Sequence, residues 1–304
     1  MGREHHGASL FVFLDATIGP LDRPAVRMAA ESRQILLNGE LGGPSVTLKS
    51  GDQVELLLAT EAIQRQSPEA LPILVQEDQL IIAVKPTGVA FDAGRANRGD
   101  SAMERLSEQS GGARPRAPHR LDKFTSGLVV AALSRRSEAE LAGAFRNGSA
   151  TMEYLAVVRR PPKADEGTID IPLGKSKRSE AILQPDPKRG RACVTHWRVS
   201  ERLRGFAVLT LTPEGGRSHQ VRAHLACQGF PALCDRDYGE DDRILLSQLK
   251  LHYRSKRGRP ERALFDRPAV HASTFRWQGR EVTSPLPEDM DVLLKQLRRL
   301  RPLK

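Results

Sequence analysis

The chain has 304 residues, enough for one large domain and a small companion, with 47 lysines and arginines against 37 aspartates and glutamates. Its net charge of +10 and pI near 9.9 predict attraction to a polyanion, and nucleic acid is the first candidate, although many basic proteins bind none. Three cysteines without a Cys-x-x-Cys pair exclude a disulfide framework and indicate a reducing, cytoplasmic compartment. The apolar run "LFVFL" is too short for a signal sequence or a membrane span.

The beginning of the chain predicts a small domain over residues 1–60. A helical stretch over 24–40 is followed by two strand-like segments within 46–58, which a Gly-Asp turn separates. Residues 61–72 are polar and contain prolines, so we expect a linker there. The large domain is then expected over 73–304.

The large domain is rich in strand patterns. Alternating or β-branched runs predict strands in "PILVQEDQLIIAVKP", "TSGLVVAAL", "MEYLAVVRR", "VTHWRVSERLRGFAVLTLTP" and "AVHASTFRWQG". Apolar residues at helical spacing predict helices in "SRRSEAELAGAFRNG", "RSHQVRAHLACQGF" and "PEDMDVLLKQLRRL". Because strands and helices do not alternate regularly, the pattern favours an α+β fold over a doubly wound parallel sheet.

Basic stretches interrupt these elements. They are rich in Gly, Pro and charge, and we expect mobile loops that are either solvated or bind phosphate. The stretches are "GRANRGD" with "GGARPRAP", "PDPKRGR" and "RSKRGRPERALFDRP".

One carboxylate stands out among the bases. In "PHRLDKFTSGLVVAALS", Asp122 lies between Arg120 and Lys123, ahead of a turn and a buried strand. Such an acid can act as a nucleophile, a general base or an ion-pair partner. Near an apolar floor it needs a cation to remain charged, and Arg222 in "GRSHQVRAHL" is our candidate. We find no second acid of the kind that a glycosidase requires.

The segment "HRLDKFTSGL" resembles the H-R-L-D-x-x-T-S-G signature of the RluA-type pseudouridine synthases. The resemblance continues in order through "ILVQEDQLIIAVKPTGV", "MEYLAVVRR", "TPEGGRSHQVRAHLACQGFPALCDRDYG" and "VHASTFRW". It implies the pseudouridine synthase fold, an α+β fold in which helices flank a mixed, largely antiparallel central sheet.

The resemblance implies isomerisation of uridine in rRNA or tRNA. The carboxylate of Asp122 would start cleavage of the glycosidic bond, so that the uracil rotates and rejoins the ribose through carbon 5. Whether that carboxylate attacks the ribose or the base stays open. Tyr154 would stack on the uracil and serve in proton transfer, and Arg222 would pair with Asp122. No cofactor, nucleotide or metal is implied, and we expect a monomer that binds RNA and no membrane.

The same resemblance suggests RNA contacts around the acid. Arg120 would help to displace the extruded base, and His119 would shape the loop. Further residues are expected to contact the RNA or its phosphates: Lys123, Arg217, His219 and Gln220. Base flipping costs a few kcal/mol and must be offset by such contacts.

Residues 1–60 resemble a small α/β RNA-binding domain of the ribosomal S-four type. In "ILLNGELGGPSVTLKSGDQVEL" a strand leads to a Gly-Asp turn, as in the second half of that domain. Its first helix would carry only Arg23, Arg27 and Arg33.

Two other functions stay open. A non-catalytic RNA-binding protein could hold zinc with side chains spaced as structural ligands can be: His219, His224, Cys227 and Cys234. An RNA N-glycosidase could instead use Asp122 and would release free base, whereas a pseudouridine synthase leaves the mass of the RNA unchanged.

Overall fold

The computed structural model describes residues 7–18, 26, 29, 34–41, 46–57, 69–92, 101–111, 113–176, 182–250, 253 and 261–303. The chain divides into two compact units, Met1–Glu69 and Ala70–Lys304, here called unit 1 and unit 2. Within the described ranges, no helix has the length and apolar character that a membrane span requires.

Unit 1 packs a helix against a small sheet. Its elements are α1 (Leu10–Ile18), β1 (Ile35–Leu37), β2 (Glu40–Leu41) and β3 (Val54–Leu56), and the sheet order is β2-β1-β3. The helix predicted over 24–40 is wrong at its end, because residues 35–41 form a hairpin. Asn38 and Gly39 have φ values of 54° and 79°, the left-handed conformations that a two-residue hairpin turn needs. Of the two predicted strands, only β3 forms; Thr47 makes an isolated bridge to Ser9.

Unit 2 is built on one large sheet, in which nine strands pair among the described residues. In sheet order they are β4 (Ile73–Gln76), β5 (Leu80–Lys85), β6 (Ser126–Ala132), β15 (Val270–Trp277), β7 (Ala150–Arg159), β12 (Phe206–Glu214), β11 (Val194–Leu203) and β8 (Glu166–Asp170), while β16 (Arg280–Thr283) pairs with β15. Only β6 and β15 are parallel neighbours in this set. The α+β class and the mixed, largely antiparallel sheet are therefore confirmed.

The parallel contact between β6 and β15 requires a glycine. At Gly127 φ is +113°, and an added Cβ would lie 2.1 Å from the carbonyl oxygen of Ala272. All seven residues of β6 are buried, which explains its continuous apolar run.

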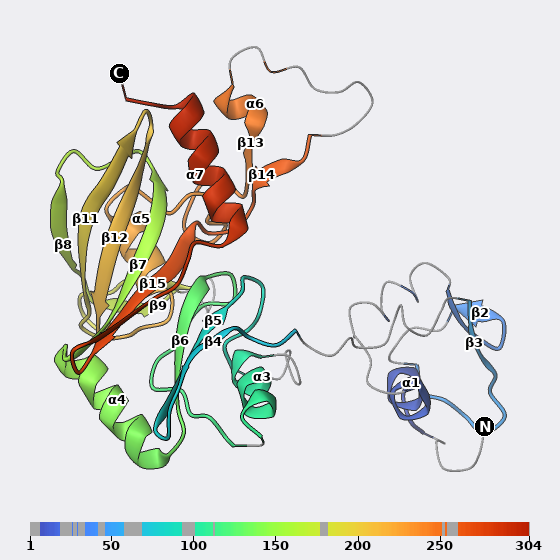
Figure 1. The fold of residues 1–304 in the computed structure, drawn as a ribbon. Helices are drawn as coiled ribbons and strands as arrows, with labels where there is room; N and C mark the ends of the chain where they lie inside the picture. Colours follow the sequence, from blue (N-terminus) through green and yellow to red (C-terminus); the bar gives the residue numbers. More distant parts are fainter. Residues whose placement is uncertain are drawn as a thin grey trace. The chain divides into compact units, whose positions relative to one another are not determined.

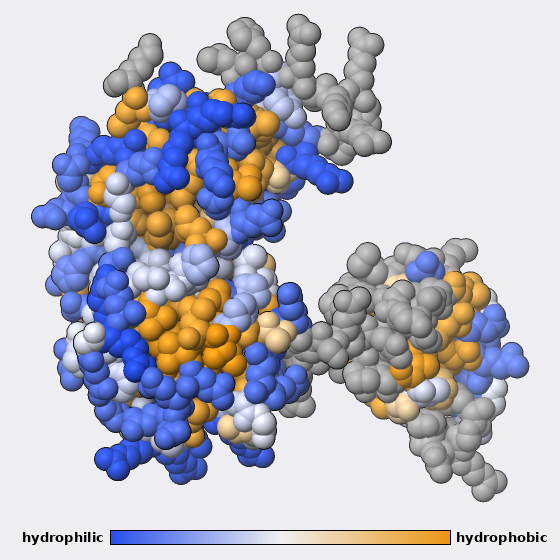
Figure 2. Space-filling model, viewed as in Figure 1, coloured by the Kyte–Doolittle hydropathy of each residue, from blue (hydrophilic) through white to orange (hydrophobic). Residues whose placement is uncertain are grey.

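Helices cover both faces of the sheet (Figure 1). The helices of unit 2 are α3 (Ala102–Gln109), α4 (Arg135–Asn147), α5 (Gln220–Cys227), α6 (Leu246–Leu249) and α7 (Glu288–Leu300). On β7, Val157 packs in the cluster that contains α7, whereas its neighbours Ala156 and Val158 pack in the cluster that contains α5. This period of two places α5 and α7 on opposite faces. Figure 2 shows hydrophobic residues gathered over β5 and β6 and over the strands beside α7.

Two short antiparallel strand pairs complete unit 2, and two of the predicted basic loops adjoin them. β9 (Leu173–Lys175) pairs with β10 (Leu183–Pro185), and β13 (Ile244–Leu245) pairs with β14 (Ala263–Phe265). The stretch "PDPKRGR" starts in β10 and turns back at Asp186, whose side chain accepts hydrogen bonds from the backbone of Lys188 and Arg189. The end of "RSKRGRPERALFDRP" is β14, and its first part, like "GRANRGD", lies outside the described residues.

Candidate active site

Asp122 begins a tight turn immediately before β6. The backbone N–H of Thr125 donates to the carbonyl oxygen of Asp122 at 3.1 Å, so Lys123 and Phe124 are the central residues of a four-residue turn. The side chain of Asp122 is 15% exposed. Its Oδ1 accepts from the backbone N–H of His219 at 3.3 Å, and its Oδ2 lies 3.3 Å from Nη1 of Arg222. The turn thus presents a carboxylate to α5 while leaving it within reach of solvent.

The start of α5 is shaped to receive that carboxylate. His219, the residue before the helix, has φ of 57°, a left-handed conformation that is uncommon for a residue other than glycine. This conformation accompanies the N–H bond from His219 to Asp122, and the positive end of the helix dipole also favours an anion there. Strain of this kind is typical of functional sites.

Arg222 is the centre of an ion-pair network. Its guanidinium binds Asp235 with two hydrogen bonds of 2.7 and 2.6 Å and Asp237 with one of 2.7 Å. Burial lowers the pKa of Arg222, but the carboxylates of Asp235, Asp122 and Asp237 together outweigh this effect. The net pKa is raised, so the side chain stays charged. The ring of Tyr238 lies 5.1 Å from the guanidinium carbon. Asp235 binds Nε and Nη2 of the guanidinium, and Asp122 lies beside Nη1.

A cleft opens in front of Asp122. Its volume is about 150 Å³, close to that of a protein cavity known to hold benzene, so a six-membered ring fits. Tyr154 from β7 lines it together with Asp122, Arg222 and Val270. Burial raises the pKa of Tyr154, and the charge of Asp122 raises it further, so the phenol is neutral at physiological pH.

Two buried basic side chains, Lys85 and Arg267, donate hydrogen bonds to backbone carbonyls of the Asp122 turn. Lys85, at the end of β5, is fully buried, and its Nζ donates to the carbonyl oxygens of Lys123, Pro86 and Val89 at 2.8–3.0 Å. Burial lowers the pKa of Lys85 to about 7, although the charge of Asp122 raises it. Sequence reasoning included Lys85 in a matched block but gave it no role. The signal was a lysine that directly follows the buried run "LIIAV".

Arg267 supports the next carbonyl of the turn. Its Nη1 donates to the carbonyl oxygen of Phe124 at 3.1 Å, and Thr87 Oγ1 donates to the same oxygen at 3.1 Å. Two bonds to Asp289 of α7, of 2.6 and 2.9 Å, fix the guanidinium. Sequence reasoning placed Arg267 in a solvated basic stretch and so missed it.

Comparisons with known proteins identify the family of the chain. A family model described as RNA pseudouridylate synthase matches residues 79–227. The RNA pseudouridine synthase YlyB of Bacillus subtilis is 30% identical over 303 residues, which cover 94% of this chain and 93% of that protein. The chain belongs to the RNA pseudouridine synthase family. It is therefore an isomerase, and the resemblance to the RluA type is confirmed.

Further relatives extend the family match. Ribosomal large subunit pseudouridine synthase D of Xanthomonas campestris is 30% identical over 280 residues, covering 88% of this chain and 82% of that protein. The solved structure of human RNA pseudouridylate synthase domain containing 4 superposes with a TM-score of 0.55 at 21% identity, over 75% of this chain and 93% of that one. At this identity the superposition supports the fold alone.

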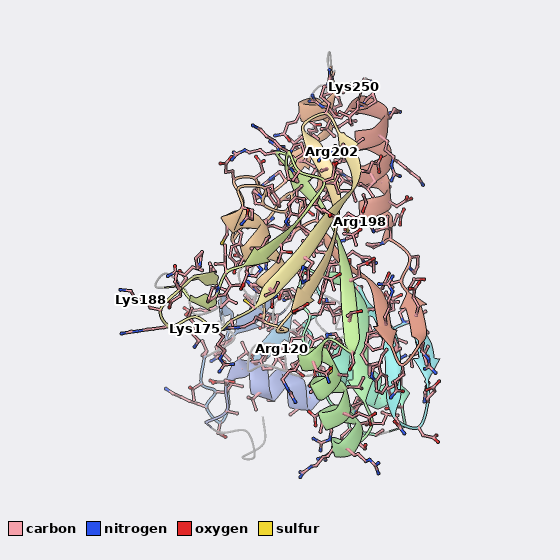
Figure 3. The ribbon with its side chains drawn as sticks, turned by 90° about the vertical axis from the view of Figure 1, so that its left-hand side faces the viewer. Arg120, Lys175, Lys188, Arg198, Arg202 and Lys250 are labelled. Atoms are coloured by element: carbon pink, nitrogen blue, oxygen red, sulfur yellow. The ribbon has the colours of Figure 1, made fainter. Side chains whose placement is uncertain are left out.

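The predicted RNA contacts of this synthase occupy different places. Arg120 is exposed and lines the cleft, and His119 lines it from between the rings of Phe91 and Phe145. Burial lowers the pKa of His119 to about 4, so its neutral Nε2 accepts from the N–H of Val130 at 2.9 Å. This bond joins His119 to β6, and RNA binding by His119 stays a prediction. Figure 3 shows Arg120, Lys175 and Lys188 among the basic side chains on one side of the molecule.

The remaining predicted contacts divide between the cleft and its support. Arg217 and His219 line the cleft, and Arg217 Nη1 donates to the carbonyl oxygen of Leu173 at 2.7 Å. Lys123 is exposed outside the lining. Gln220 is 2% exposed, and its amide binds backbone atoms of Val194, Glu214 and Arg217. These hydrogen bonds join the start of α5 to β11 and β12. RNA binding by Gln220 stays a prediction.

Two side chains of the zinc alternative, His224 and Cys234, make other contacts. His224 bonds to Thr195 Oγ1 and to the carbonyl oxygen of Ile171, and Cys234 contacts the carbonyl oxygen of Phe265. In the part of the chain that the structure describes, no three His, Cys, Asp or Glu side chains are grouped as metal ligands.

Proposed function

We propose that Asp122 is the nucleophile of this synthase and that its substrate is a uridine in large-subunit ribosomal RNA. The proposal depends mainly on the position of one carboxylate, held between the N–H of His219 and the guanidinium of Arg222 at the wall of a cleft of ring size. A nucleophile needs such fixed geometry and an exposed attacking oxygen. Asp235, Asp237 and Asp289 also bind arginines, but unlike Asp122 they do not line the cleft.

The reaction needs no co-reactant. The bond between N1 of uracil and C1′ of ribose breaks, a bond between C5 and C1′ forms, the C5 proton leaves, and N1 gains a proton. Asp122 assists the first bond cleavage and is regenerated at the end. Tyr154, a neutral phenol on the cleft wall, is suited to stack on the uracil and to relay the proton.

The choice of ribosomal RNA is supported by the names of relatives. Three relatives with 29–30% identity are named ribosomal large subunit pseudouridine synthase D. Exposed basic residues of unit 2 suit the phosphates: Arg120, Lys175, Lys188, Arg189 and Arg191. We also propose that residues 1–60 form an S-four-like RNA-binding module, that 61–72 form a linker, and that 73–304 form the catalytic domain. The Asn-Gly hairpin and helix of unit 1 agree with such a module.

The test is to map pseudouridines in ribosomal RNA from cells with and without the protein, and with Asp122→Asn. We expect Asp122→Asn to abolish modification while RNA affinity stays within several-fold, because the lost group acts on the bond and not on the backbone. Asp78→Asn, in the exposed β4–β5 turn, is the matched control and should leave modification intact. Normal modification by Asp122→Asn would refute the assignment.

A further inference from the structure

The turn that carries Asp122 also displays an aromatic ring. Phe124 is 50% exposed, and it is the only aromatic residue among the seven large hydrophobic side chains that are exposed within the described ranges. The exposed Lys123 lies beside it, with Nζ 5.9 Å from the ring centroid. An apolar ring and a cation thus occupy the two central positions of one turn.

The exposure of Phe124 is fixed by the backbone. The carbonyl oxygen of Lys123 accepts from the buried Lys85, and that of Phe124 accepts from Thr87 and the buried Arg267. Both central carbonyls are therefore held from inside the protein, so the backbone that carries the exposed Phe124 and Lys123 side chains is fixed. A backbone that is already ordered loses little conformational entropy when a ligand covers its side chains.

The position of the ring relative to the cleft indicates which ligand would cover it. Asp122 and Thr125, the first and last residues of the turn, line the cleft, whereas Lys123 and Phe124 do not. A base beside Asp122 therefore leaves the Phe124 ring free for another group. On an RNA strand, the nearest flat apolar group is the neighbouring base, and its phosphate carries the charge that complements Lys123.

We propose that Phe124 and Lys123 form a second nucleotide subsite at the rim of the cleft. Phe124 stacks on an unpaired base that flanks the target uridine, and Lys123 contacts the phosphate beside it. This subsite deepens the proposed function, since it requires an RNA substrate, but it does not require Asp122 to be the nucleophile. It also implies that the substrate is single-stranded next to the target, because a paired base does not expose its face.

Binding to short single-stranded RNAs tests the subsite. The probes are adenosine oligomers with one central uridine, either complete or with an abasic ribose directly before or after the uridine. From the energy of base–aromatic stacking, we expect Phe124→Ala to weaken binding of the complete probe by about five- to one-hundred-fold. Phe124→Trp should preserve the affinity. Leu74→Ala, which removes a side chain of β4 that is 42% exposed, is the matched control and should change nothing.

The abasic probes separate stacking from a general effect. Wild type should lose affinity for one of the two abasic probes by the same factor, and Phe124→Ala should show no further loss on that probe. Lys123→Gln should reduce the salt dependence of binding by about one phosphate contact. The subsite is refuted if Phe124→Ala binds the complete probe like wild type, or if its loss is equal on all probes. These binding readouts are independent of the turnover of Asp122→Asn, so the two proposals can fail separately.

Discussion

Three carboxylates share the guanidinium of Arg222, and we expect their replacement to rank differently for stability and for activity. Asp235 is completely buried and binds through two bonds of 2.7 and 2.6 Å. The side chain of Asp237 is 41% exposed and binds once at 2.7 Å, while that of Asp122 is 15% exposed and lies at 3.3 Å. Replacing each acid in turn with asparagine removes the charge and keeps the shape.

The expected losses of stability follow from this burial. Asp235→Asn leaves a buried arginine without its closest counter-charge, which costs about 3–5 kcal/mol. For a unit of this size, that loss lowers Tm by roughly 6–20 °C. An exposed ion pair contributes about 1 kcal/mol or less, so Asp237→Asn should shift Tm little. Asp122→Asn leaves the other two carboxylates in place, and we expect a change within about 1 kcal/mol.

The expected losses of activity follow the contact with substrate. Asp122→Asn should abolish pseudouridine formation, whereas Asp237→Asn should retain it within a few-fold. At temperatures below the Tm of the Asp235→Asn variant, the activity of that variant should lie between those two. Calorimetry and quantification of pseudouridine in RNA measure the two rankings on the same preparations. If Asp122→Asn lowers Tm as much as Asp235→Asn does, Asp122 is a structural partner of Arg222 and the reasoning is refuted.

Further predictions concern the residues around the acid. Tyr154→Phe should lower kcat by about a hundred-fold or more while KM changes little, because only proton transfer is lost; an unchanged kcat would leave stacking as its sole task. Gly127→Ala should reduce the free energy of unfolding by about 3 kcal/mol or more, since its Cβ would meet the Ala272 carbonyl in a strained conformation, and denaturant titration measures this loss. Turnover should fall as pH rises through about 7, where Lys85 loses its proton, and Lys85→Arg should move that decline to higher pH. Because an unfolded lysine titrates near about 10.4, the lowered pKa of Lys85 in the folded protein contributes stability that rises with pH between about 7 and 10, opposite to turnover. The difference in Tm between wild type and Lys85→Met measures this contribution, and a difference that does not change in favour of wild type over this range would contradict the burial of the cation.

Much of unit 2 could be predicted from the sequence. Its strands bury long apolar or alternating runs, and α4 is capped by Ser134 and Gly148, the residues at which the sequence predicted its ends. The sequence predicted that Asp122 and Arg222 pair, because a partly buried carboxylate needs a cation to stay charged and because the family resemblance implies this pair. The structure contains the ion pair. Helix α3 was missed although Ser101 and Glu104 form a capping pattern, because the charged and Gly-rich stretches on both sides suggested a loop.

The support beneath the active site could not be predicted in the same way. Lys85 and Arg267 act on backbone carbonyls of the Asp122 turn, and every residue has such carbonyls. No side-chain pattern therefore marks the partner of either cation. The contact exists only because β5 pairs with β6 and because the segment before β15 returns to the same end of the sheet.

This arrangement holds the carboxylate of Asp122, the nucleophile that we propose, in a fixed position. Desolvating two cations costs several kcal/mol each, and apolar side chains at these places would avoid that cost. The side chains of Lys85 and Arg267 instead bind the carbonyls of Lys123 and Phe124, the two residues that follow Asp122, and so restrain the turn that holds the carboxylate beside Arg222. A reaction that depends on positioning gains from such rigidity. Neutral replacements at Lys85 or Arg267 should therefore lower kcat more than they weaken RNA binding, since they loosen the acid and leave the exposed basic residues unchanged.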